Sequence, residues 1–259
     1  MVTITPGTAR QFLQALELPP STARGFEGFE AAPLIDFNEQ KNQAMVVASD
    51  IVSFVKGVSV ERRQDITNAC LLAQLAANKK VPDRSRIIEW YNAYFEVLEN
   101  IGWVIQDKGF ASYEERADGL EAHEAILKVA ATILAPSPTA LMVITSTLEA
   151  MKSIEAGKPW ITLFDRESKY TNVARFQIAL VEQGDADQFL VSLMAFSLEA
   201  QSTLTQVLFF KIRSDSVKLK HCTGKVTIND AVLSGVRAQI KTKVAAYASN
   251  FIASLPDLG

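Results

Sequence analysis

The chain has 259 residues, of which 48% are hydrophobic and 21% are charged, and its formal net charge at pH 7 is −3. This composition is typical of a globular protein and excludes a largely disordered chain. The overall charge gives no reason to expect nucleic acid as a partner. Residues 200–259 nevertheless hold eight Lys or Arg against three Asp or Glu, so this segment is either an ordinary solvated basic face or a surface for an anionic partner.

The first forty residues are rich in Pro and Gly and predict an N-terminal arm over 1–40, with a short helix near Ala9–Leu16. The opening segment lacks a basic start followed by a long apolar run. We therefore expect no signal peptide and synthesis in the cytoplasm, with leaderless release and membrane association as a further expectation. Two cysteines are too few for a disulfide scaffold, and we expect both to be reduced.

Three helices are predicted after the arm from apolar residues at helical spacing. The first covers 38–57, and the second, "VERRQDITNACLLAQLAANKK", is capped by Ser59. The third, "RSRIIEWYNAYFEVLENIGWVIQ", carries a broad aromatic stripe. Core packing is the more common role of such a stripe, so we assign it to the core.

The segment from Val129 to Leu148 has no charged residue and reaches the length of a membrane span. Pro136 and Pro138 interrupt it, because proline inside a helix removes a hydrogen bond and clashes with the preceding turn. One interpretation is two buried helices that meet at a turn. The other is an apolar hairpin over 129–148 that enters a bilayer after a conformational change.

The last third changes to a β-rich pattern. We predict a strand over 173–184, a helix over 185–201, and a meander with turns at Ser214-Asp215 and Thr223-Gly224. Asn229 then caps a final helix that reaches about Leu255. The expected fold class is α+β, in a single domain over 41–259. A helical part (41–157) precedes a part (158–259) with a small antiparallel sheet in the order β-α-β-β-β-α.

A basic strand face is the main candidate site. Because side chains alternate across a strand, the predicted meander places one cysteine and five cations opposite its apolar residues: Cys222, Lys211, Arg213, Lys218, Lys220 and Lys225. Lysines near an anionic membrane contribute about 1 kcal/mol each, and an acyl chain plus a basic patch anchors a protein stably. The face therefore predicts an anionic membrane surface as partner, with Cys222 as the attachment point of a fatty acid. A structural cysteine on a solvated strand is the alternative.

Catalytic and metal-binding motifs are scarce. The chain has no G-x-S-x-G, Walker A, G-x-G-x-x-G or H-E-x-x-H sequence, and its two His and two Cys lack metal-ligand spacing. We predict no catalytic residue, no metal and no cofactor other than the covalent fatty acid. Neighbours in a strand point to opposite faces, which argues against a dyad of His221 and Cys222. A thiol-dependent acyl-transfer enzyme that uses Cys222 remains an alternative.

The size of the chain, the helix "EWYNAYFEVLENIGW" and the late cysteine in "KLKHCTGK" resemble the Evf-type bacterial virulence factors in layout. These are leaderless α+β proteins that carry a fatty acid on a cysteine. The resemblance implies palmitate on Cys222, although Cys70 is a second candidate. It implies a non-enzymatic, membrane-interacting protein, either a cysteine-acylated virulence factor or a toxin component. Pore formation by 129–148 is an alternative function, and the sequence does not indicate the oligomeric state.

Overall fold

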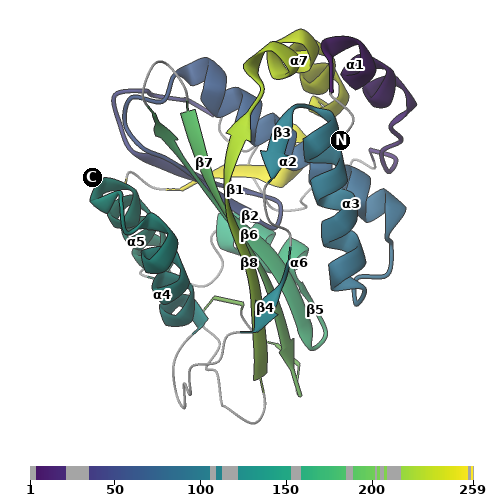
Figure 1. Cartoon of the computed structure of the whole chain (residues 1–259). Coiled ribbons are helices and arrows are strands. Elements are labelled where there is room, and N and C mark those ends of the chain that lie inside the picture. Colours follow the sequence, from purple (N-terminus) through teal and green to yellow (C-terminus); the bar gives the residue numbers. More distant parts are fainter. Residues whose placement is uncertain are drawn as a thin grey trace.

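A central sheet with helices on both faces forms the molecule in the computed structural model (Figure 1). The structure describes residues 4–21, 35–105, 109–112, 122–152, 159–184, 189–201, 203–204, 207–208, 217–255 and 258. Its helices are α1 (Pro6–Ala15), α2 (Val60–Lys80), α3 (Ile87–Asn100), α4 (Ala122–Leu134), α5 (Pro138–Lys152), α6 (Pro159–Ser168), α7 (Asp230–Val244) and α8 (Ala248–Phe251). Its strands are β1 (Gln43–Val47), β2 (Asp50–Phe54), β3 (Trp103–Ile105), β4 (Ala111–Ser112), β5 (Lys169–Tyr170), β6 (Val173–Gln183), β7 (Phe189–Ala200), β8 (Val217–Ile228) and β9 (Ile252–Ser254).

The sheet is mixed and draws strands from both ends of the chain. Within the described residues the order is β3-β8-β7-β6-β2-β1-β9, with β4 beside β8 and β5 beside β6. β2 and β6 are parallel, and the other pairs are antiparallel. The α+β class is thus confirmed, with the longest strands in the last third. The sheet is larger than expected because the predicted helical part also contributes strands.

Two hydrophobic cores lie on the two faces of the sheet. One core holds buried residues of α1, α2, α3 and α7 together with the side chains of one sheet face. The other holds buried residues of α4, α5 and α6 with the side chains of the opposite face. The aromatic stripe belongs to the first core, as predicted, since Trp90, Tyr91 and Tyr94 are at most 1% exposed. We call these the α2–α3 face and the α4–α5 face of the sheet.

Several helix boundaries follow the predicted signals. The Ser59 hydroxyl accepts a hydrogen bond from the amide of Arg62 at the start of α2. The Asn229 side chain accepts one from the amide of Val232 at the start of α7. Both contacts satisfy amide groups that a helix N-terminus leaves without intrahelical partners. The last helix was predicted too long, because α7 ends at Val244 and is followed by α8 and β9.

The helix predicted over 38–57 is wrong, because the structure has the β1–β2 hairpin there. Ala48 adopts a φ of 51° in the tight turn between the strands. All five residues of β2 are buried, so the strand shows no alternation of apolar and polar residues. A strand covered on both faces produces a continuous apolar run that sequence periodicity cannot distinguish from a buried helix.

Two further predictions in the last third are wrong, and the first is wrong for the same reason. The helix predicted over 185–201 is the strand β7, which lies between β6 and β8 and is buried along nearly its whole length. No turn occurs at Thr223-Gly224, since β8 runs unbroken and pairs with β7 at these residues. The turn at Ser214-Asp215 and the part of the predicted meander that precedes it lie mostly outside the described residues.

Candidate functional site

The α4–α5 hairpin covers one face of the sheet with an apolar surface. Its two helices are separated by a short turn at the two prolines, as predicted for a pair of helices. Figure 1 shows both helices on the same side of the sheet. Their buried side chains pack with those of β6 and β7 in one core and include Ile126, Val129, Leu134, Val143, Ile144 and Leu148. The interpretation as core helices is therefore confirmed for this conformation.

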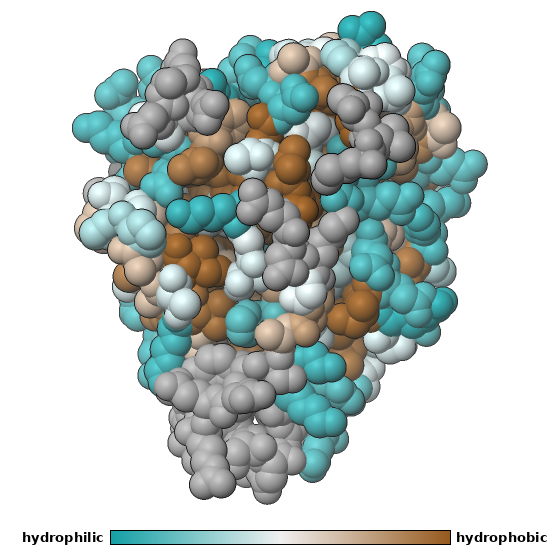
Figure 2. Space-filling model, in the orientation of Figure 1, coloured by the Kyte–Doolittle hydropathy of each residue, from teal (hydrophilic) through white to brown (hydrophobic). Residues whose placement is uncertain are grey.

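The outward side of the hairpin carries no charge between Val129 and Leu148. A surface helix ordinarily has charged or polar residues on the side away from the core. Here Met142 is 55% exposed, and Ile133 and Leu141 are partly exposed. In Figure 2, hydrophobic residues reach the surface on the side where Figure 1 shows α4 and α5. The hairpin thus has an uncharged outer surface near its turn.

None of the helices in the described part of the chain combines the length and the hydrophobicity that a membrane crossing requires.

Side-chain hydrogen bonds link the hairpin to the strands beneath it. The hydroxyl oxygens of Ser53 in β2 and Thr147 in α5 are 3.2 Å apart and share a hydrogen bond. The Ser137 hydroxyl, in the turn of the hairpin, donates to the carboxylate of Glu182 in β6 at 2.7 Å. Apolar packing with β6 and β7 also holds the hairpin, and such packing is not directional.

The structure does not bring the basic candidates onto one face. Lys211 and Arg213 lie outside the described residues. Lys218, Lys220 and Lys225 are all exposed, but β8 alternates without a break, so Lys225 points to the α4–α5 face. Lys218 and Lys220 point to the other face, beside Glu199 and Ser197 of β7. The shared basic face depended on the turn at Thr223-Gly224, which does not occur.

Lys225 lies at the same end of the sheet as the turn of the hairpin. The strand register places Leu180, Ser192 and Lys225 in one row across β6, β7 and β8. Glu182, which binds the hairpin turn through Ser137, is two residues further along β6 on the same face. The structure therefore groups one cation with the uncharged turn. Lys218 lies about 23 Å away along the strand, at roughly 3.3 Å per residue.

Cys222 lies in the core on the α2–α3 face, beside Ala195 of β7, and is 5% exposed. His221 points to the opposite face, as predicted, and burial lowers the pKa of its imidazole. Neither Cys70 nor Cys222 forms a disulfide in the structure, and both are buried. In this conformation Cys222 is not placed to attack a substrate or to receive an acyl group from solvent.

A buried polar cluster on the α2–α3 face was not predicted. Asp50, at the start of β2, is 1% exposed and accepts hydrogen bonds from the Tyr94 hydroxyl at 2.9 Å and from the Gln177 amide at 3.1 Å. Burial raises the pKa of the Asp50 carboxyl well above its usual range, although these two hydrogen bonds oppose the shift. Burial also raises the pKa of Cys70, whose thiol interacts with Asp50 and Tyr94. The sequence holds one signal for this cluster, because Asp50 is the one charged residue in the apolar segment 44–55.

A metal site is not apparent in the ranges that the structure describes, where no three His, Cys, Asp or Glu side chains are grouped to hold an ion.

Comparisons with known proteins give a weak structural likeness and nothing at the level of sequence. No protein-family model and no curated protein matches the chain. One similar solved structure, described as that of the Evf virulence factor, is 11% identical with a TM-score of 0.37 and covers 96% of this chain and 91% of its own. A second, a delta-endotoxin, is 17% identical with a TM-score of 0.40 and covers 80% of this chain and 96% of its own. The chain thus resembles one virulence factor and one toxin, only weakly and only in structure.

Proposed function

We propose that the protein binds membranes and that the α4–α5 hairpin is the element that contacts lipid. The observation that carries this proposal is the uncharged stretch from Val129 to Leu148, which covers the turn of the hairpin, the second half of α4 and most of α5. An outer surface without charge around the turn suits the boundary between headgroups and acyl chains. The buried side of the hairpin is apolar as well, so lipid could replace the sheet as its partner.

The hairpin suits shallow insertion. Its helices of 13 and 15 residues are about 20 and 22 Å long at 1.5 Å per residue. An interfacial helix buries its apolar side about 5–10 Å deep in the headgroup region, and both helices are long enough for that arrangement. Lys225, at the same end of the sheet as the turn, supplies a cation for anionic headgroups. We therefore propose an anionic membrane surface as the partner, contacted by the hairpin and by Lys225.

We also propose, as a more specific part of this function, that Cys222 is acylated and that the protein acts in virulence. Both statements rest on the layout of the chain, which resembles that of Evf-type factors. The buried position of Cys222 requires that β8 opens locally before an acyl group can be attached, or that the acyl chain is attached during folding. Membrane binding through the hairpin does not depend on this modification.

A charge on the turn side of the hairpin should weaken membrane binding. Met142→Glu places a carboxylate at a position that is 55% exposed, so we expect no change in stability. Binding to vesicles of phosphatidylcholine and phosphatidylserine, measured by flotation, should fall at least about tenfold, since an ionised side chain is costly to bury in lipid. Entrapped dye in the same vesicles reports any pore formation.

The matched control for this experiment is Ile88→Glu. Ile88 is 45% exposed on α3, so this variant adds the same charge to an exposed apolar helix position away from the hairpin. It should bind vesicles as the wild-type protein does. Equal binding by both variants and the wild type, or no binding by the wild type, would reject the hairpin as the lipid contact.

If Cys222 is acylated, the protein purified from its native source should have an excess mass equal to a fatty acyl group. Hydroxylamine, which cleaves thioesters, should remove that excess, and peptide mapping should place it on Cys222. A Cys222→Ser variant provides the control. An unmodified mass, or modification at Cys70 alone, would contradict the assignment.

A further inference from the structure

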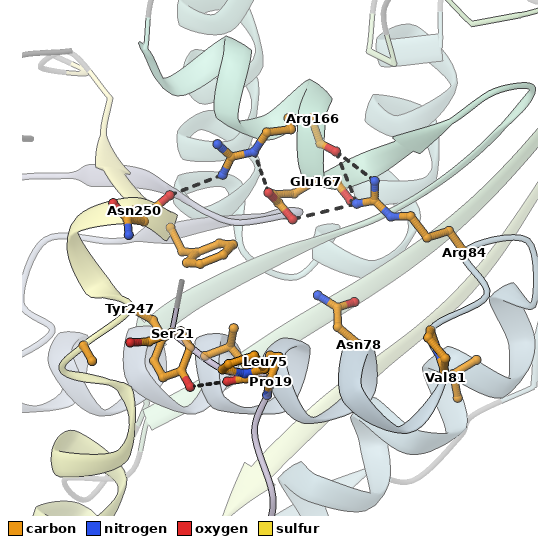
Figure 3. A pocket seen from close by; sticks show the side chains of 14 residues that line it. Pro19, Ser21, Leu75, Asn78, Val81, Arg84, Arg166, Glu167, Tyr247 and Asn250 are labelled. Carbon is orange, nitrogen blue, oxygen red and sulfur yellow. Dashed lines mark hydrogen bonds and ion pairs between the residues drawn. The ribbon is translucent and has the colours of Figure 1, made fainter. Parts of the chain in front are cut away.

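A pocket of about 540 Å³ lies where four segments of the chain meet. Figure 3 shows that Asn78 of α2, Arg84 of the α2–α3 connection, and Arg166 and Glu167 at the end of α6 line it together with Tyr247. Phe251 also belongs to the lining. It shares no lining residue with the α4–α5 hairpin. Its volume falls within the range of small-molecule sites in proteins.

Two guanidinium groups and one carboxylate meet on one wall of the pocket. Arg84 donates to the backbone carbonyl of Arg166 at 3.2 Å and to that of Glu167 at 2.9 Å. Its guanidinium is also 3.8 Å from the Glu167 carboxylate. Arg166 donates to the same carboxylate at 2.6 Å. Glu167 therefore compensates two cations at once, and the described lining has one positive charge in excess.

A third guanidinium lies directly behind this wall. Arg175 is 3% exposed and donates to the side-chain oxygen of Asn78 at 3.0 Å and to the carbonyl of Arg84 at 3.3 Å. Its guanidinium stacks on the ring of Trp90, 4.3 Å from the centroid. No carboxylate of the described residues forms an ion pair with it within 4.0 Å. A buried cation without an ion-pair partner is costly, and an anion in the adjacent pocket would lower that cost.

The opposite wall of the pocket is apolar. Leu75, Val81 and the prolines at positions 19, 20 and 82 form it, whereas the ring of Phe251 lies beside the Arg166 guanidinium, which is 5.7 Å from the ring centroid. The Tyr247 hydroxyl is held by the carbonyl of Pro19 at 2.5 Å. A ligand of matching chemistry has an anionic group on the arginine side and an apolar body on the other.

We infer that this pocket binds a phosphate monoester with an apolar or aromatic body. Arg84, Arg166 and Arg175 together exceed Glu167 by two positive charges, and a phosphate monoester carries about −1.5 to −2 at pH 7. Guanidinium groups match phosphate oxygens in charge and planar geometry. The apolar wall selects against inorganic phosphate alone. Such a group is present both in soluble organic phosphates and in the headgroup of phosphatidic acid.

Calorimetric titration of the full chain at pH 8 tests the inference with four probes. They are phenyl phosphate, inorganic phosphate, benzyl alcohol and short-chain dihexanoyl phosphatidic acid below its micelle concentration. Phenyl phosphate should bind at least about tenfold more tightly than inorganic phosphate or benzyl alcohol, because only it satisfies both walls. Tighter binding of the phosphatidic acid would assign the site to a lipid, and tighter binding of phenyl phosphate to a soluble ligand.

Two variants that change the charge of the pocket in opposite directions distinguish ligand binding from a structural role. Arg166→Gln should weaken phenyl phosphate binding at least about tenfold, whereas Glu167→Gln should strengthen it several-fold because it removes the competing carboxylate. Arg86→Gln, which removes an exposed cation outside the pocket, should have no effect. Circular dichroism melting checks that each variant is folded. No phosphate binding at millimolar concentration, or equal or weaker binding by Glu167→Gln, would overturn the inference, whatever the outcome of the vesicle experiments.

Discussion

A protein in which the hairpin is fixed to the sheet by a disulfide should not bind vesicles until it is reduced. Ser53 and Thr147 offer the position, because their hydroxyl oxygens are 3.2 Å apart and both side chains are fully buried between β2 and α5. The short distance between the hydroxyl oxygens makes this pair the candidate for an S–S bond, which requires Cβ atoms about 3.5–4.5 Å apart. If the hairpin must leave the sheet to expose its apolar side, the oxidised double variant retains the closed form.

The expected effect is a loss of at least about tenfold in vesicle binding, fully restored by reductant in the same sample. Ser53→Cys and Thr147→Cys as single variants provide controls, since each alters the buried hydrogen bond without forming the crosslink. Mass spectrometry after alkylation confirms the bond and checks that the native cysteines, both buried, stay out of it. Equal binding by the oxidised and the reduced double variant would show that the hairpin contacts lipid without leaving the sheet.

The sequence predicted the features that depend on local chemistry. Helix starts at Ser59 and Asn229 follow from side chains that accept amide hydrogen bonds, and the break between α4 and α5 follows from proline. The uncharged stretch from Val129 to Leu148 was also visible without coordinates. These signals need no knowledge of neighbouring strands, and they identified the hairpin as a candidate site.

The features that depend on tertiary position could not be predicted. β2 and β7 are covered on both faces, which removes the alternation that marks a strand. A turn was predicted inside β8, and it placed Lys225 on the same face as Cys222. Because β8 is continuous, the two side chains lie on opposite faces of the sheet. The pocket has no local signal at all, because its arginines come from separate segments that only the fold brings together.

Replacing Asp50 by asparagine should make the protein more stable than the wild type at neutral and alkaline pH. The carboxyl of Asp50 is buried, and burial raises its pKa well above its usual range. In the unfolded chain the pKa of an aspartate is about 3.9. Above that pH the unfolded state releases a proton that the folded state retains. The wild-type free energy of unfolding therefore falls by up to about 1.4 kcal/mol per pH unit, until the native carboxyl also ionises.

Asparagine cannot ionise, so the variant should lack this part of the pH dependence. Its side chain can still accept one hydrogen bond and donate another to the oxygen of Tyr94 or the amide oxygen of Gln177. Urea unfolding of both proteins between pH 4 and pH 9 should give curves that converge at the acidic end and separate as the pH rises. A difference that is constant across this range would mean that the native Asp50 is ionised.

Asp83→Asn is a control for which the expected change in stability at neutral pH has the opposite sign. Hydrogen bonds from the hydroxyl and the amide of Ser85 lower the pKa of the exposed Asp83 carboxyl, so its contribution to stability is present above the unfolded pKa and lost as the pH falls. This variant should be slightly less stable than the wild type at neutral pH.

The result for Asp50 also bears on the pocket. A neutral Asp50 leaves the charge of Arg175 uncompensated from within the core, and that excess charge is what a bound phosphate would balance.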